Sequence, residues 1–171
     1  MRFAPSMLAL ALAATLGTAV SFAQAPAMHP AFPRVTKLFA SSSEVAALIE
    51  KAKRDHKPGQ ANVLEPLLSL APYRALLEYR TAVGPAAVHI HQDEFLYVID
   101  GSGTLITGGK LVHPVQVNAE NLSGDSIIGG TAVSIAKGDF IVVPENTPHW
   151  FSSIHGHVTD ISLHVPGSEA R

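Results

Sequence analysis

The stretch His89-Ile90-His91-Gln92-Asp93-Glu94 decides how this chain is interpreted, together with the later stretch Pro144-Glu145-Asn146-Thr147-Pro148-His149. His89 and His91 lie two residues apart in a β-type run, so both imidazoles are expected on one face of a strand. Three imidazoles and one carboxylate can hold a divalent transition metal and leave positions open for a substrate. The sequence therefore predicts a metal site formed by His89, His91, Glu94 and His149.

Around these stretches the hydrophobic period is two, and Gly, Pro, Asn and Asp interrupt it at short intervals. No second helical pattern lies between the β-type runs, so the sequence predicts an all-β sandwich or barrel. The expected strands are Tyr73 to Ala82, Ala87 to His91, Phe95 to Asp100, Gly103 to Thr107, Ala132 to Ile135, Phe140 to Pro144, His149 to Ser153 and Val158 to Val165.

One amphipathic helix is expected before the strands. Ser41 and Glu44 have the spacing of a capping box, and apolar residues then recur at helical spacing until Pro58-Gly59. This predicts a helix over about 42–55. The Gly-rich and Asn-rich segment 108–130 is expected to be a long loop with one short strand pair, either a lid or interface or an ordered surface excursion.

The N-terminus has the pattern of a secretory signal peptide. Arg2 precedes an uncharged Leu- and Ala-rich run over 7–20, and small residues precede a cut after Ala23. A membrane anchor is the alternative, but the run is shorter than the roughly 20 residues that a span needs. We expect residues 1–23 to be removed and 24–40 to be a mobile lead-in. The mature protein would then be periplasmic or secreted, with no stable membrane anchor.

Composition narrows the classes of function. The 171 residues are 47% hydrophobic and 15% charged with a formal net charge of −2, which fits one globular domain and gives no basic surface for nucleic acid. The absence of cysteine excludes disulfides, thiol catalysis and thiolate metal ligands. An exported protein would acquire its metal where copper and zinc compete well with iron and manganese for N and O ligands.

The two stretches resemble the two motifs of the cupin superfamily, G(X)5HXH(X)3,4E(X)6G and G(X)5PXG(X)2H(X)3N. Residues 84–101 match the first, with one residue fewer before His89 and one fewer before Glu94, and residues 138–153 match the second. The resemblance covers roughly 73–165. It implies an antiparallel double-stranded β-helix, a jelly-roll barrel over 73–166. A helix and connection at 41–72 would precede it, and a tail at 167–171 would follow.

The departures from the motifs bear on the ligand set. Asn146 stands where the family has Gly, and Asn tolerates a positive φ better than most residues, so the turn can still form. Ser153 replaces a more distant Asn. The short interval between His91 and Glu94 leaves Asp93 as an alternative oxygen ligand, but Glu94 keeps the family distance to the following Gly and is preferred.

The remaining candidates are weaker. His155, His157 and His164 are expected at the surface or at an interface, because His164 lies opposite the apolar face of its strand. A non-redox reaction would need a general base, and Glu145 and Asp93 are weakly supported candidates for it. The sequence identifies no catalytic residue. Side chains on strands that carry or neighbour ligands could line a pocket, although each is as well explained by packing: Tyr79, Arg80, Tyr97, Trp150 and Phe151.

Two main functions remain open, besides a structural or interaction role through the N-terminal helix and a barrel edge. The first is a metal-dependent enzyme of dioxygenase, isomerase or lyase type, acting on a small oxygenated or aromatic substrate with one Fe, Mn, Zn, Ni or Cu ion. The second is a non-catalytic periplasmic protein that binds a metal, a sugar or a metabolite. Either is compatible with the homodimer that pairing of barrel edges would give.

Overall fold

The computed structural model describes residues 36–168, so the predicted signal peptide and most of the lead-in lie outside the described residues. One helix and eleven strands follow in order: α1 (Ser42–Asp55), β1 (Asn62–Leu70), β2 (Tyr73–Arg80), β3 (Ala86–His89), β4 (Gln92–Thr107), β5 (Lys110–Val112), β6 (Val115–Asn118), β7 (Asn121–Gly124), β8 (Ser126–Ile128), β9 (Thr131–Ala136), β10 (Phe140–Val143) and β11 (His149–Pro166).

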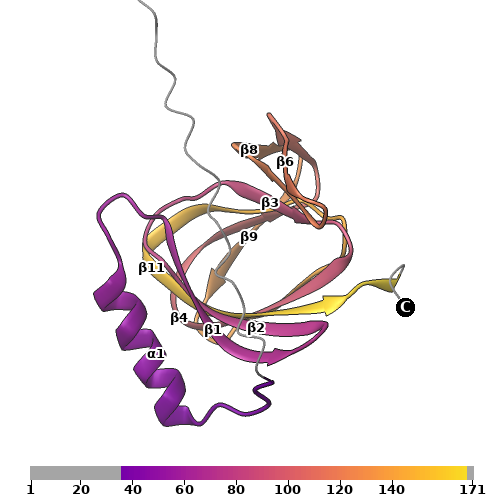
Figure 1. The fold of residues 1–171 in the computed structure, drawn as a ribbon. Helices are drawn as coiled ribbons and strands as arrows, with labels where there is room; N and C mark the ends of the chain where they lie inside the picture. Colours follow the sequence, from indigo (N-terminus) through magenta and orange to yellow (C-terminus); the bar gives the residue numbers. More distant parts are fainter. Residues whose placement is uncertain (1–35, 169–171) are drawn as a thin grey trace, which may run out of the picture.

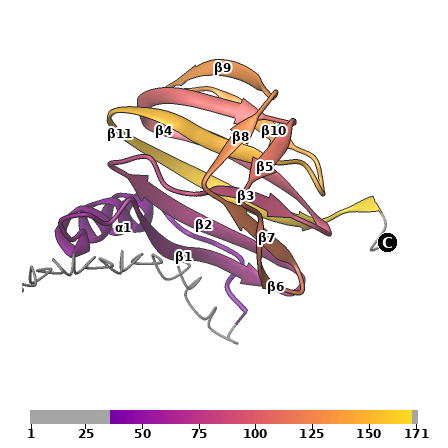
Figure 2. The ribbon, with the colours of Figure 1, turned by 90° about the horizontal axis from the view of Figure 1, so that it is seen from above.

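The strands form a mainly antiparallel curled sheet, as the sequence predicts. Within residues 36–168, nine strands belong to one sheet, and β5 and β8 pair separately. The two long strands β4 and β11 run along each other for most of their length, and β2 pairs with the second half of β11. Figure 1 shows these strands closing around a common interior, and Figure 2 shows the same barrel from above.

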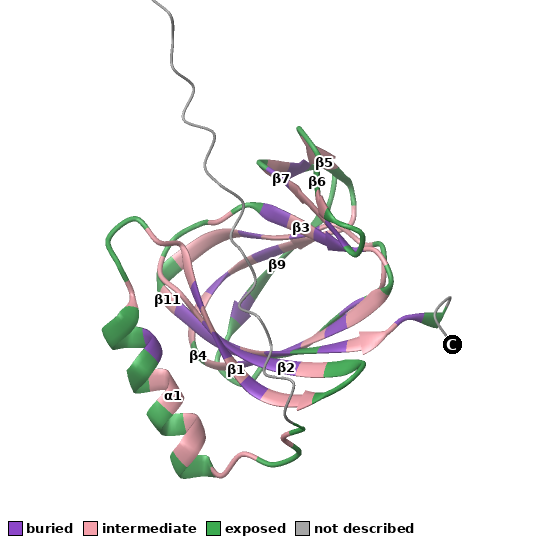
Figure 3. Cartoon of the chain, viewed as in Figure 1, coloured by how far each residue is buried: buried purple, intermediate pink, exposed green. Residues whose placement is uncertain are grey.

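Helix α1 lies where the sequence predicts it. Ser41 caps α1 by accepting a hydrogen bond from the Glu44 amide at 3.2 Å. Ala52 is fully buried, and it belongs to a cluster with Val63 of β1 and Leu77 of β2. The helix therefore covers the outer face of β1 and β2, and Figure 3 shows it lying outside the barrel. The residues of β2 that alternate with Leu77 face the barrel interior.

Three features of the sheet differ from the sequence prediction. Strand β1 lies in the stretch predicted as a connection, and it pairs with β2 despite Pro66, where the register shifts. The runs predicted as two strands each, on either side of Gly101 and of Gly156, are the single strands β4 and β11. The predicted loop over 108–130 contains two strand pairs, β5 with β8 and β6 with β7.

Gly101 explains why β4 can continue. Its φ is +86°, and a Cβ at this position would lie 2.0 Å from the His157 carbonyl oxygen on β11. Only glycine permits this approach of the two backbones. The bulge in the register between β4 and β11 is therefore built into the motif that ends at Gly101.

Candidate metal centre

Four buried side chains meet at one end of the barrel. His89 is the last residue of β3, Glu94 lies near the start of β4, His149 opens β11, and His164 lies near the end of β11. His164 stands opposite Glu94 in the pairing of β11 with β4. The exposed fractions of these four residues are between 2% and 6%. We call these four residues the histidine cluster.

The Nε2 atoms of the three histidines lie around the Glu94 carboxylate. His149 Nε2 is 3.1 Å from Glu94 Oε2, and His89 Nε2 is 3.7 Å from the same oxygen. His164 Nε2 is 3.7 Å from Glu94 Oε1. The His89 ring lies edge-on to the His164 ring with centroids 4.6 Å apart, and 5.1 Å from the His149 ring.

This arrangement fits a divalent transition metal. Ligand atoms at about 2.1 Å from one ion stand roughly 3.0–3.5 Å from each other in octahedral or tetrahedral geometry. The separations of 3.1 and 3.7 Å from the Glu94 oxygens lie close to that range. His89, Glu94 and His164 each offer a ligand atom within 4.8 Å of the others. Imidazole and carboxylate donors suit Zn, Fe, Mn, Ni or Cu.

Neighbouring groups fix the orientation of two histidines. The Nδ1 of His89 lies 2.6 Å from the Asn121 Oδ1, and the Asn121 amide nitrogen donates to Asn118 Oδ1 at 2.9 Å. Because the amide oxygen can only accept, His89 donates from Nδ1, and this hydrogen bond orients Nε2 toward Glu94. His149 Nδ1 lies 3.3 Å from the Thr147 carbonyl oxygen, which favours the same tautomer.

The turn before β11 connects the two motifs directly. Asn146 has a φ of +55°, which confirms the left-handed conformation expected where the family has Gly. Its backbone N–H donates to the His89 carbonyl oxygen at 2.7 Å. The turn therefore places His149 and His89 side by side, because the same few residues contact the end of β3 and begin β11.

Burial keeps the imidazole of His149 neutral. The pKa of His149 is lowered to about 3, first by burial and then by the nearby His89. A metal needs the neutral imidazole, so this environment favours a ligand over a charged surface group.

The structure does not bring His91 into the histidine cluster. Strand β3 ends at His89, and Ile90 and His91 form a turn, so the alternation that would put both imidazoles on one face stops before His91. The His91 side chain is exposed, and its carbonyl oxygen accepts from the Gly167 amide at 2.9 Å. The alternative oxygen ligand Asp93 instead accepts a hydrogen bond from the Glu145 amide at 2.9 Å.

The sequence prediction for His164 is wrong. It placed this histidine at the surface because the opposite face of the strand is apolar, but the apolar face is the outer one, where Leu163 is 37% exposed. His164 faces the barrel interior and is 2% exposed. In a closed sheet, interior and exterior side chains alternate along each strand, so a polar residue that alternates with apolar exterior residues faces the interior. The alternation of His164 with Leu163 and Val165 is this signal in the sequence.

The five predicted pocket residues divide between the two faces of the sheet. Tyr79 packs on α1 from outside, and Tyr97 is 45% exposed. The Trp150 indole donates to the Gly84 carbonyl oxygen at 2.9 Å. Arg80 and Phe151 meet in the interior, with the guanidinium carbon 4.1 Å from the ring centroid.

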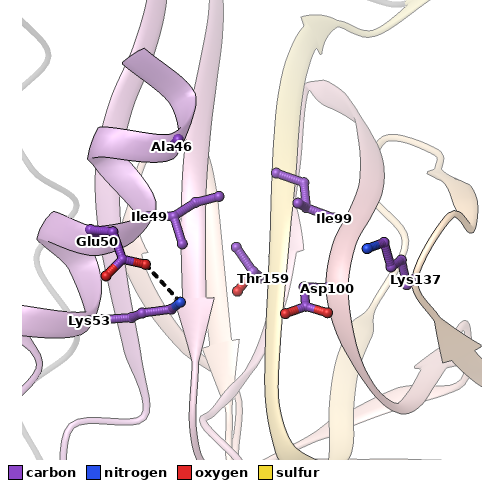
Figure 4. Close-up of a pocket in the computed structure, with 8 residues that line it drawn as sticks. All are labelled: Ala46, Ile49, Glu50, Lys53, Ile99, Asp100, Lys137 and Thr159. Atoms are coloured by element: carbon purple, nitrogen blue, oxygen red, sulfur yellow. Dashed lines mark hydrogen bonds and ion pairs between the residues drawn. The ribbon is translucent and has the colours of Figure 1, made fainter. Parts of the chain in front are cut away.

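A separate cavity of about 330 Å³ lies outside the barrel, between α1 and the sheet (Figure 4). Glu50 and Lys53 form an ion pair of 2.9 Å on the helix side, and Asp100 and Lys137 lie on the sheet side. None of the residues that line it belongs to the histidine cluster.

The comparisons with known proteins give one local likeness in sequence. No family model matches the chain. A segment of 66 residues is 36% identical to an acireductone dioxygenase of Leptospira biflexa serovar Patoc, which covers 38% of this chain and 28% of that protein. The chain thus matches little more than a quarter of this relative.

Solved structures give weaker likenesses. The hydroxypropylphosphonic acid epoxidase from S. wedmorenis is 18% identical with a TM-score of 0.46, covering 62% of this chain and 51% of that one. A mannose-6-phosphate isomerase-like protein of Ralstonia eutropha JMP134 is 15% identical with a TM-score of 0.47, covering 66% and 93%. Likeness at this level bears on neither the reaction nor the substrate of this chain.

Among residues 36–168, no helix has the length and hydropathy that crossing a membrane would need.

Proposed function

We propose that this protein is a metal-dependent enzyme of the cupin type, which binds one divalent transition metal through His89, Glu94, His149 and His164. The observation that carries the proposal is the convergence of three buried imidazoles on one buried carboxylate. His91, which the sequence favoured as a ligand, has an exposed side chain outside this group. The local likeness to an acireductone dioxygenase supports a reaction of dioxygenase type.

The substrate is a small oxygenated or aromatic molecule, and the reaction is of dioxygenase, isomerase or lyase type. When bound, the metal would polarise an oxygen of the substrate or activate dioxygen. The protein's own residues would exclude water from the barrel interior and hold the His89 and His149 imidazoles in the tautomer that leaves Nε2 free. Four protein ligands would leave two positions open on an ion that takes six ligands, whereas they would complete a tetrahedral zinc site.

Metal analysis combined with a substrate screen tests this function. Purified protein should contain about one transition metal per chain, and oxygen uptake should be measured with small acids, phenols and sugars. Iron with substrate-dependent oxygen uptake supports the dioxygenase, and turnover without oxygen supports the isomerase or lyase. Metal binding without turnover of any compound would favour the alternative, a non-catalytic protein that binds a metal, a sugar or a metabolite.

Export is part of the proposal. The signal-peptide pattern over residues 1–23 predicts a periplasmic or secreted mature protein that begins near Gln24. Mass spectrometry of the protein from its native compartment would detect this shorter chain. A full-length chain that begins at Met1 would contradict export.

A homodimer is the assembly that the outer surface favours. Four exposed apolar side chains gather on β4, β10 and β11: Tyr97, Phe140, Val142 and Leu163. Strand β10 pairs only with β4 among the described strands, so its other edge leaves backbone groups for a second copy. Light scattering should give a dimer for the wild type and a monomer for Phe140→Asp. A wild-type monomer would contradict this assembly.

A further inference from the structure

A second buried polar group lies deeper in the barrel. We call Glu78, Arg80 and Asp160 the Arg80 cluster. Asp160 is fully buried on β11, opposite Glu78 of β2. It lies on the same strand face as His164, and Ser162 stands between them. Four residues of strand separate Asp160 from His164, which corresponds to roughly 13 Å.

The hydrogen bonds of this cluster serve Glu78. Its carboxylate accepts from the Arg80 guanidinium, from Asn62 Nδ2 at 2.8 Å and from Ser162 Oγ at 2.8 Å. Arg80 in turn stacks on Phe151. Glu78 and Arg80 therefore form an ion pair whose charges cancel, and Arg80 Nε, which has no hydrogen-bond partner within residues 36–168, lies 3.6 Å from Asp160 Oδ1.

Asp160 receives no comparable stabilisation. Within residues 36–168 neither of its oxygens has a hydrogen-bond partner, and Oδ1 lies 3.6 Å from Arg80 Nε, beyond a hydrogen bond. An ionised Asp160 would give this buried group a net negative charge, because one guanidinium would face two carboxylates. The protonated carboxyl is therefore the form that this geometry stabilises.

The charged groups that face Asp160 also favour its protonated form on balance. Burial raises the pKa of the Asp160 carboxyl well above its usual range, and the negative charge of Glu78 adds to this effect. Arg80 lowers the pKa, and Glu94 of the histidine cluster raises it again. The carboxyl that binds the metal therefore also acts electrostatically on Asp160.

A divalent cation at the histidine cluster would reverse the contribution of Glu94. The bound cation outweighs the negative charge of Glu94, so the field at Asp160 changes from negative to positive. Salt in the solvent screens buried charges little, and the effect persists across the barrel interior. The proton leaves the Asp160 carboxyl for bulk water, and no other reactant is required.

We propose that Asp160 stores a proton in the metal-free barrel and releases it when a divalent cation binds the histidine cluster, so that Asp160 is a carboxylate base only in the loaded protein. This inference rests on the proposed function, because it requires the metal to bind at the histidine cluster.

Calorimetry of zinc binding tests the coupling. Titrations between pH 6 and 8 in buffers of different ionisation enthalpy count the protons released per zinc. At some pH in this range, the wild type should release up to one proton more per bound zinc than Asp160→Asn does. Asp125→Asn, which removes an exposed carboxylate paired with His113, is the matched control and should behave as the wild type.

The outcomes separate the two proposals. Equal proton release by the wild type and Asp160→Asn, with zinc bound to both, overturns the role of Asp160 and leaves the metal site intact. Absence of zinc binding by the wild type overturns the proposed function and, with it, the coupling.

Infrared spectroscopy of the wild type gives a second test that does not depend on the variant folding. The metal-free protein at pH 7 should show the C=O stretch of a buried protonated carboxyl, and zinc should weaken this band. A spectrum without the band, or a band that zinc leaves unchanged, contradicts the proposal.

Discussion

The histidine cluster and the Arg80 cluster lie in one barrel interior, and each contains a buried carboxylate in a different environment. Around Glu94, the Nε2 atoms of three imidazoles lie 3.1 to 3.7 Å from the carboxylate oxygens, close to the separation of two ligand atoms on one ion. Around Asp160, the only cation within residues 36–168 is Arg80, which is already paired with Glu78. Burial alone therefore does not define the role of an acid: the first site suits a cation, and the second suits a proton.

The largest effect expected at the histidine cluster comes from its carboxylate. Glu94→Gln removes the negative ligand, so zinc affinity should fall by more than about 100-fold, since loss of an outer partner alone typically costs 10- to 100-fold. Glu120→Gln, at an exposed position, is the control and should bind zinc as the wild type does. Competition with a chromogenic chelator measures both. Unchanged affinity in Glu94→Gln would remove Glu94 from the site.

The comparison of His164 with His91 is the next test. His164→Ala should lose about 100-fold in zinc affinity, as expected for a lost ligand rather than an outer partner. His91→Ala should change it by no more than about 2-fold, as for a surface substitution. The same chelator competition applies. The reverse pattern would restore the ligand set expected from the sequence.

Asn121 should have a smaller effect, because it orients His89 without contacting the ion. Asn121→Ala should weaken zinc binding by about 10- to 100-fold. Asn121→Asp keeps an acceptor for the His89 Nδ1 proton and should retain most of the affinity. If both variants bind as weakly as each other, the loss would come from packing and not from the hydrogen bond.

The two clusters should also give the metal-free protein opposite responses to pH. The folded pKa of His149 is lowered to about 3, so its contribution to stability is present above pH 6.5 and is lost as pH falls. This loss should reach about 2 kcal/mol at pH 5. Asp160 has a raised folded pKa, so its contribution is present below pH 3.8 and is lost as pH rises.

Urea unfolding across pH 4.5 to 9 measures both responses. His149→Gln should reduce the loss of stability in acid, and Asp160→Asn should reduce the loss at high pH. If the Asp160→Asn variant instead becomes less stable than the wild type as pH rises, Asp160 is ionised in the folded protein and the prediction is wrong.

Much of the barrel was predictable from local patterns. The Ser41 cap and the apolar spacing gave α1 its observed bounds, and the period of two located most strands. Strand β1 was missed because Pro66 interrupts it and the stretch follows a helix, yet pairing with β2 stabilises it. Long strands were divided in two at Gly101 and Gly156, because glycine marks both turns and bulges.

The metal centre was predictable in part for a different reason. The motifs name residues that are close in sequence, and His89, Glu94 and His149 of the predicted set lie together in one buried group. His164 comes from the opposite end of β11, and only the closure of the sheet brings it opposite Glu94. The end of β3 at His89, which turns His91 outward, depends on the turn at Ile90 and has no clear signal in the sequence.

X-ray absorption spectroscopy of the zinc-loaded protein tests the central claim most directly. The account predicts a single zinc bound only by nitrogen and oxygen, with three imidazoles in the wild type and in His91→Ala, and two in His164→Ala. Loss of an imidazole in His91→Ala, with three retained in His164→Ala, would contradict it.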